Sequence, residues 1–228
     1  MHIGPLLGSG RTADVYALDD SWVLRRYRND VDTAAELAVM SYLSAHGYPV
    51  PRIGGPPAGV EVLPTDLVIQ RLTGPTLAEA LLTGTVTGIE GAAVLARLLR
   101  ELHAIPPRIS QDPADRILHL DLHPENVVLT SGGALVIDWP TATEGPPALD
   151  RAMSSLILAE VALDPEHSAG ECVRDLLPPL LARLAEDGGV PADALARATA
   201  LRAANPSLSA RETAVSAEAA ELVAALAG

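Results

Sequence analysis

The sequence predicts an α+β protein in which a small strand-rich part precedes a larger, mainly helical part. Short runs of alternating apolar residues, separated by turn residues, occupy much of residues 1–72. Longer segments with apolar residues at helical spacing follow, most clearly over residues 89–103. Thr73-Gly74-Pro75 interrupts the chain between these two patterns, so we expect one part at residues 1–72 and the other at residues 73–228.

Composition limits the class of protein. The chain has 228 residues, of which 48% are hydrophobic, which is enough for a sizeable core. The single cysteine, Cys172, excludes an intrachain disulfide and fits a reducing cytoplasm. No signal-peptide pattern and no apolar run of membrane-spanning length is present. A net charge of −13 argues against nucleic-acid binding and would attract a cationic partner. We therefore expect a cytoplasmic protein without a membrane or nucleic-acid partner; composition says nothing of its oligomeric state.

The first strands flank a glycine-rich turn at Gly8-Ser9-Gly10. Glycines let a backbone approach phosphate oxygens closely, although a plain β-turn would explain them too. A hairpin over residues 15–27 is predicted next, turning at Asp19-Asp20-Ser21. Strand alternation then places Val23, Arg25 and Tyr27 on one face.

Helices account for most of the remaining chain. The segment Asp30 to His46 is predicted to be helical, with Asp30 or Asp32 as its cap and Gly47 at its end. A capping box at Thr76 opens a further helix. Beyond a helix that begins near Asp150, the pattern predicts three helices between residues 164 and 228, with breaks at residues 187–189 and 205–206.

The chemistry is concentrated in the run His119-Leu120-Asp121-Leu122-His123-Pro124-Glu125-Asn126 and in Asp138. Two short strands, joined at Ser131-Gly132-Gly133, are expected to bring Asn126 and Asp138 to the same end of a hairpin. An amide oxygen and a carboxylate suit Mg²⁺, which prefers oxygen ligands and retains waters and substrate phosphates. Asp121, just before the hairpin, can accept a proton from an attacking hydroxyl. This arrangement predicts a phosphoryl-transfer site.

These residues, with Ile137-Asp138-Trp139, resemble the aminoglycoside phosphotransferase and choline kinase-like family, the small-molecule kinases of the protein-kinase-like superfamily. Protein kinases have Lys at the position of His123 and Phe-Gly at the position of Trp139-Pro140. The resemblance implies a protein-kinase-like two-lobed fold, with a small β-rich N-lobe that has one helix and a larger, mainly helical C-lobe.

The resemblance also implies roles for individual residues. Asp121 takes or orients the hydroxyl proton, and Asn126 and Asp138 hold Mg²⁺. Arg25 stands at the position of the kinase lysine that holds the phosphates of ATP, or of GTP in its place, and Glu36 pairs with it. The remaining nucleotide contacts are assigned to Gly8, Ser9 and Gly10 over the phosphates, to Val23 beneath the adenine, and to Gln70 and Leu72 at its edge.

The histidines and the acceptor are less defined by the sequence. His123 is expected to orient Asp121 or to contact the γ-phosphate, with a structural loop residue as the alternative. His103 and His119 are expected to have structural roles, and Asp150 is expected to stabilise the loop or the start of its helix. The acceptor is expected to be a small molecule with a hydroxyl group. If this molecule is cationic, the acidic C-lobe would favour its binding.

Three alternatives remain at this point. The first is a zinc site built from His119, Asp121 and His123, in place of a magnesium site. A pseudokinase that binds nucleotide without catalysis is favoured by Arg25 in place of Lys and by Ala13 in place of the third glycine. An enzyme of the same fold that transfers a nucleotidyl group is the third.

Overall fold

The computed structural model describes residues 3–10, 12–29, 33–55, 59, 61–205 and 210–228, with no side chains for 210–214. The chain forms two compact units. Unit 1 contains Met1–Gly74 and Val128–Pro140, and unit 2 contains Pro75–Val127 and Thr141–Gly228. Residues from two separate stretches of the chain thus make up each unit. The assignment of lobes to residues 1–72 and 73–228 stays a prediction.

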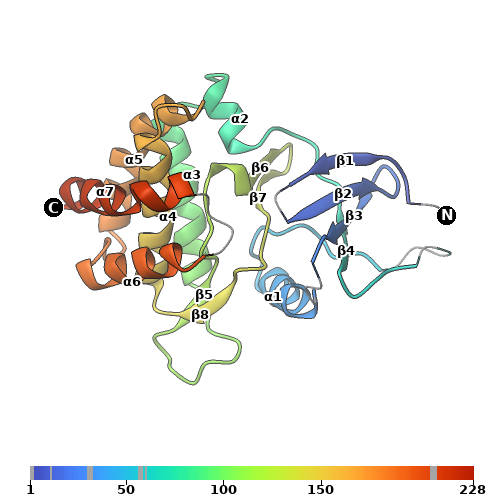
Figure 1. Ribbon diagram of the computed structural model, residues 1–228. Helices are drawn as coiled ribbons and strands as arrows, with labels where there is room; N and C mark the ends of the chain where they lie inside the picture. Colours follow the sequence, from blue (N-terminus) through green and yellow to red (C-terminus); the bar gives the residue numbers. More distant parts are fainter. Residues whose placement is uncertain (1–2, 11, 30–32, 56–58, 60, 206–209) are drawn as a thin grey trace. The chain divides into compact units, whose positions relative to one another are not determined.

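Unit 1 is built on an antiparallel sheet of four strands in the order β1-β2-β3-β4 (Figure 1). The strands are β1 (Leu6–Ser9), β2 (Ala13–Ala17), β3 (Trp22–Tyr27) and β4 (Asp66–Gln70). One helix, α1 (Ala34–Ala45), and the hairpin of β6 (Val127–Thr130) and β7 (Gly133–Val136) complete the regular structure. The α+β prediction, with one helix beside the first strands, is confirmed.

The sheet of unit 1 has apolar side chains on both faces. On one face, Ala13, Tyr27 and Leu67 form a buried cluster, against which Leu37 of α1 packs. On the other face, Leu18, Leu24 and Val68 form a second cluster. The alternation predicted for β3 is therefore present, because Leu24 and Tyr27 face opposite sides.

Helix α1 buries one stripe of its surface, which includes Glu36 together with Val39, Met40 and Leu43. Gly47 follows the helix with a positive φ of 77°, as the sequence predicts for a helix end. The predicted caps, Asp30 and Asp32, lie outside the described residues. A buried glutamate on an otherwise apolar stripe needs a partner, because an unpaired carboxylate is costly to bury.

Unit 2 is mainly helical. Its helices are α2 (Leu77–Leu82), α3 (Gly88–His103), the short 3₁₀ helix η1 (Pro124–Asn126), α4 (Pro147–Leu163), α5 (Gly170–Ala185), α6 (Ala192–Ala203) and α7 (Ala210–Ala227). Two short antiparallel strands, β5 (Arg116–Leu118) and β8 (Thr143–Gly145), precede the site residues and α4, respectively. The predicted capping box at Thr76 is present, and the three predicted C-terminal helices are confirmed.

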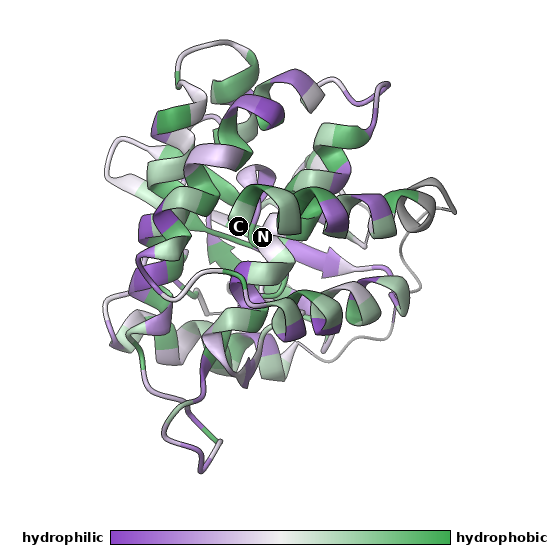
Figure 2. Ribbon diagram, turned by 90° about the vertical axis from the view of Figure 1, so that its left-hand side faces the viewer, coloured by the Kyte–Doolittle hydropathy of each residue, from purple (hydrophilic) through white to green (hydrophobic). Residues whose placement is uncertain are grey.

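Helix α4 lies at the centre of unit 2, packed against α5, α6 and α7, and most of its residues are buried. The helices around it alternate between hydrophobic and hydrophilic segments along their length (Figure 2). This pattern is typical of helices that present one face to a core. None of the helices in the described part of the chain is long and apolar enough to cross a membrane.

Candidate active site

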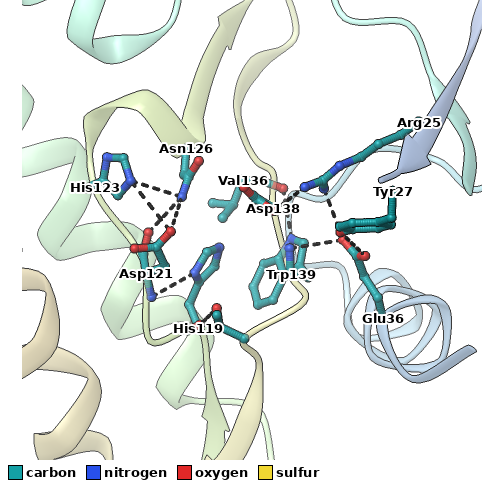
Figure 3. Close-up of polar contacts among 11 residues, drawn as sticks. Arg25, Tyr27, Glu36, His119, Asp121, His123, Asn126, Val136, Asp138 and Trp139 are labelled. Carbon is teal, nitrogen blue, oxygen red and sulfur yellow. Dashed lines mark hydrogen bonds and ion pairs between the residues drawn. The ribbon is translucent and has the colours of Figure 1, made fainter. Parts of the chain in front are cut away.

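Arg25 lies in the middle of the sheet of unit 1, where β3 pairs with Val15 of β2 and Leu67 of β4. Its guanidinium donates from Nη1 to Glu36 Oε1 at 3.3 Å, and from Nη2 to Asp138 Oδ1 (Figure 3). Its side chain is only 12% exposed, so these two carboxylates take the place of water. The predicted pair of Arg25 and Glu36 is therefore present in the structure.

Asp138 follows β7 by two residues and adopts a left-handed backbone conformation with φ of 70°. This conformation is unfavourable for most non-glycine residues, and such residues concentrate at functional sites. Only Oδ1 of Asp138 is bonded to Arg25; Oδ2 has no partner among the described residues. The side chain is 33% exposed.

The glycine-rich turn spans the end of β1 and the start of β2. The Gly10 N–H donates to Ala13 O at 2.9 Å, which closes the turn, and Ser9 Oγ donates to Asp14 at 2.7 Å. A Cβ placed on Gly8 would meet nothing within 4 Å. Packing within the described chain therefore does not require this glycine.

Three further residues were predicted to contact the nucleotide base. Val23 is buried in β3 and pairs with Ile69 of β4. The Gln70 N–H donates to Arg52 O at 2.8 Å and so is already engaged. Leu72 lies just beyond β4, and its backbone has no hydrogen-bond partner among the described residues. Of the two residues predicted to meet the edge of the base, Leu72 is the one with free backbone groups.

In unit 2, the loop after β5 is braced by Asp150 of α4. The buried carboxylate of Asp150 accepts hydrogen bonds from the His119 N–H at 3.0 Å and from the Leu120 N–H at 2.7 Å. His103 Nε2 lies 3.0 Å from the same carboxylate. Leu120 has a positive φ of 60°, which is strained for leucine, and the bonds from Asp150 hold it there. The structural roles predicted for Asp150 and His103 fit these contacts.

The braced loop presents Asp121, whose side chain is 32% exposed. Asn126 Nδ2 donates to Asp121 O at 2.8 Å and to Asp121 Oδ2 at 3.2 Å (Figure 3). His123 Nε2 lies 3.7 Å from the same carboxylate oxygen. Because the Glu125 N–H donates to His123 Nδ1, the proton of a neutral His123 lies on Nε2, which is the atom nearest Asp121. Oδ1 of Asp121 remains without a partner among the described residues.

The environment keeps Asp121 ionised. Burial opposes this effect, but His123, through its hydrogen bond and its charge, and the charges of His119 and Arg202 lower the pKa of Asp121 below its ordinary value. A carboxylate that is ionised, partly exposed and held by an amide on one oxygen can accept a proton at the other. A general base must first be placed within reach of the proton, and this free oxygen meets that requirement.

The polar residues fit a divalent cation. Asn126 uses its amide nitrogen toward Asp121, and its Oδ1 has no partner among the described residues. In unit 1, Arg25 carries one positive charge against the two carboxylates of Glu36 and Asp138, so that cluster is negative overall. Free oxygens of an amide and of a carboxylate are suitable ligands for Mg²⁺.

The zinc alternative does not fit the structure. Within the described part of the chain, no group of three His, Cys, Asp or Glu side chains is arranged to hold a metal ion. His119 Nδ1 instead accepts a hydrogen bond from the Asp121 N–H at 3.2 Å, which orients the loop. This contact supports the structural role predicted for His119.

No role was predicted for Tyr27 or for the pair of Arg202 and Glu160. Tyr27 donates to Glu36 Oε2 at 2.6 Å. The sequence could have indicated this role, because Tyr27 lies two residues after Arg25 on the same face of the strand. Arg202 of α6 donates to the buried Glu160 of α4 at 2.8 Å, and Ser216 of α7 donates to Glu160 at 2.5 Å. Glu160 is therefore neutralised inside unit 2, and no sequence pattern indicated its burial.

Solved structures share this fold across nearly the whole chain. A thermostable mutant of aminoglycoside phosphotransferase APH(4)-Ia, in a ternary complex with ADP and hygromycin B, matches with a TM-score of 0.66 and 14% identity, covering 97% of this chain and 93% of that one. APH(2")-IIa in complex with streptomycin and ATP matches with a TM-score of 0.58 and 15% identity, over 88% and 84% of the two chains. Amicoumacin kinase hAmiN, in complex with AMP-PNP, Ca²⁺ and Ami, matches with a TM-score of 0.54 and 16% identity, over 96% and 87%.

No curated protein sequence matches the chain. The model of the phosphotransferase enzyme family, however, matches residues 4–116 and 90–187, which together cover well over half of it. The match includes the glycine-rich turn, Arg25 and Glu36 in unit 1 and the loop with Asp121 and Asn126 in unit 2. The chain belongs to the phosphotransferase enzyme family.

Proposed function

We propose that the chain transfers the γ-phosphoryl group of ATP, or of GTP in its place, to a hydroxyl group of a small molecule. The observation that carries this proposal is the state of Asp121. Its carboxylate is ionised, partly exposed, held at Oδ2 by Asn126, and free at Oδ1 among the described residues. In this role Asp121 accepts the proton of the attacking hydroxyl, and His123 orients the carboxylate from Nε2.

Asn126 Oδ1 and Asp138 Oδ2 would hold Mg²⁺. The bound cation would neutralise charge on the β- and γ-phosphates, which is its usual contribution to phosphoryl transfer. Each of these oxygens lacks another partner among the described residues, and each belongs to a side chain whose remaining polar atom is already bonded. Family membership supports the same assignment.

Arg25, held by Glu36, would bind the phosphates that are not transferred, and Gly8, Ser9 and Gly10 would cover them with their backbone. Val23 would pack against the base, and the free backbone of Leu72 would meet its edge. Gln70 is a weaker candidate for that contact, because its N–H is bonded to Arg52 O. Structures of the same fold have been solved with ATP, ADP and AMP-PNP, which supports a nucleotide in this role.

The acceptor is proposed to be cationic. The solved structures named above include complexes with streptomycin and hygromycin B, and another APH(2")-IIa structure contains gentamicin. The net charge of −13 would draw a cation toward the protein at low salt. Glu160 does not contribute a free charge, since Arg202 neutralises it. A cytoplasmic location stays a prediction from the single cysteine.

The experiment is transfer of label from Mg-ATP to a panel of aminoglycosides, amino alcohols and neutral sugars. ATP labelled in the γ-phosphate is compared with ATP labelled in the α-phosphate, because nucleotidyl transfer would move only the second label. We expect γ-label in one acceptor class, lost in Asp121→Asn. Binding of Mg-ATP without any transfer would support the pseudokinase instead, and label from the α-phosphate would support the nucleotidyl transferase.

A further inference from the structure

The carboxylate of Glu36 has three donors within unit 1, and the shortest contact comes from a tyrosine. Tyr27 OH donates to Oε2 at 2.6 Å, while Arg25 Nη1 and the Trp139 N–H share Oε1 at 3.3 and 3.2 Å (Figure 3). Glu36 is only 5% exposed, so water does not replace a missing donor. The Tyr27 hydroxyl is therefore the only partner of Oε2 among the described residues.

The same tyrosine also contacts Arg25. The guanidinium carbon of Arg25 lies 4.7 Å from the centre of the Tyr27 ring, within the range of a cation–π interaction. Arg25 is thus in contact with Glu36, Asp138 and the ring face of Tyr27. A guanidinium can make these contacts together because it is a planar fork with donors on separate nitrogens, whereas an ammonium is a single compact charge.

We propose that Tyr27 is a positioning residue for the nucleotide site. It adapts this site to arginine at the position where protein kinases have lysine. Its hydroxyl fixes Glu36, and its ring face fixes the plane of Arg25, so that the guanidinium reaches Glu36 and Asp138 at once. This inference deepens the proposed function and rests on it. Tyr27 itself need not touch the nucleotide.

The charges around Tyr27 suit this role. Burial raises the pKa of Tyr27, and the neighbouring Glu36 carboxylate raises it further, so the phenol remains a donor at neutral pH. Burial also raises the pKa of Glu36, against the opposing effects of Arg25 and of the Tyr27 hydroxyl. Removal of the hydroxyl would leave a buried carboxylate oxygen without a donor, which is costly.

The test is the affinity for Mg-ATP and the steady-state kinetics of Tyr27→Phe and Arg25→Lys. In Tyr27→Phe, which keeps the ring, we expect the Kd and KM for Mg-ATP to rise about tenfold, because Glu36 and Arg25 are no longer held in the geometry that binds the phosphates. The KM for the acceptor should not change. Arg25→Lys should weaken Mg-ATP binding by at least about tenfold, because one ammonium does not replace the fork.

Tyr16→Phe is the matched control. Tyr16 lies on β2 and packs on the opposite face of the sheet, against Leu24, and no hydrogen bond of its hydroxyl is present among the described residues. This variant should bind Mg-ATP as the unchanged protein does. Urea unfolding of all variants separates lost affinity from lost folding.

A double-mutant cycle shows whether Tyr27 acts through Glu36. In a Glu36→Gln background, Tyr27→Phe should have little further effect on the Kd, because the two share one contact. If Tyr27→Phe lowered the affinity for Mg-ATP equally in both backgrounds, the proposal would be overturned. It would also be overturned if Tyr27→Phe or Arg25→Lys left the affinity and kcat unchanged. Should the unchanged protein bind Mg-ATP but phosphorylate no acceptor, the Kd still tests Tyr27. If the unchanged protein bound no nucleotide, the proposed function itself would be contradicted.

Discussion

Asp150 illustrates how one buried side chain supports the chemistry of another. It lies on α4, is fully buried, and accepts two backbone hydrogen bonds from the loop that presents Asp121. Those bonds hold Leu120 in a left-handed conformation that costs on the order of 1–3 kcal/mol. We infer that Asp150 sets the position of Asp121 without touching a substrate.

Asp150→Asn should therefore impair both stability and turnover. The substitution removes the charge that faces His103 and weakens acceptance of the two N–H groups, at a cost of about 3 kcal/mol. Turnover should fall while the affinity for Mg-ATP is retained. Urea unfolding and steady-state kinetics measure the two effects.

The pH dependence of stability tests the contribution of the Asp150 carboxylate to the free energy of unfolding. The pKa of Asp150 is lowered from its ordinary value of 3.8: burial opposes this shift, and the contacts with His103 and the charge and N–H of His119 outweigh it. The stabilisation is thus present above pH 3.8 and is lost as pH falls through the lower native pKa. The difference in unfolding free energy between the unchanged protein and Asp150→Asn should shrink below that pH. Asp187→Asn is the control, because it breaks an exposed pair with Arg100 and should lower the free energy of unfolding by less than about 1 kcal/mol. If both variants lost the same free energy of unfolding, Asp150 would not have the proposed role.

At the scale of residues, sequence and structure agree where a motif carries the chemistry. The contacts of Asp121 with Asn126, and of Arg25 with Glu36, join residues that the sequence analysis had already singled out. The left-handed conformation of Leu120 had no sequence signal, because leucine is not a residue that favours it. Tyr27 was placed on the correct strand face, but its contact with Glu36 depends on how α1 packs on the sheet.

At the scale of elements, Gly74 marks a close approach between two backbones of unit 1. The residue lies beyond β4 with φ of 141°, and a Cβ built there would be 2.0 Å from Leu129 O of β6. The turn residues Thr73-Gly74-Pro75 predicted a break here, but no sequence pattern indicated which strand passes beside it. The structure shows that only glycine fits.

Gly74→Ala should destabilise the protein by at least about 2 kcal/mol, because it adds backbone strain and a steric overlap with a carbonyl that cannot move freely. Gly55→Ala is the control, since its Cβ would meet nothing within 4 Å and its φ is not positive. That variant should lie within about 0.5 kcal/mol of the unchanged protein. Thermal or urea unfolding measures both, and equal stability of the two variants would show that β6 yields to the added methyl group.

The elements themselves were predictable where their pattern was long. Helix α3 and the three C-terminal helices followed from apolar spacing and from glycine and proline breaks. The three-residue strand β8, Thr143–Gly145, was missed because a short polar segment has no alternation to detect. Its pairing with β5 is a tertiary contact between residues far apart in the sequence.

At the scale of the whole molecule, nucleotide binding should stabilise the native state. A ligand that binds only the folded protein adds about 2.7 kcal/mol at a hundred times its Kd. We expect ATP with Mg²⁺ to raise the Tm and ATP with EDTA to raise it less, because Asn126 and Asp138 are proposed to act through the metal. Asp138→Ala should lose the metal-dependent part, while Asp187→Asn should keep it. An equal shift with and without EDTA would contradict a metal role for these residues.

The proposed mechanism requires Asp121 to accept a proton during phosphoryl transfer. The most direct measurement is the rate of γ-phosphoryl transfer to the acceptor by the unchanged protein and by Asp121→Asn, at saturating Mg-ATP, with the Kd for Mg-ATP determined on the same samples. We expect the rate to be lower by about 10²–10⁴ in the variant and the Kd to be unchanged. If the variant transferred phosphate at the original rate, Asp121 would not be the proton acceptor.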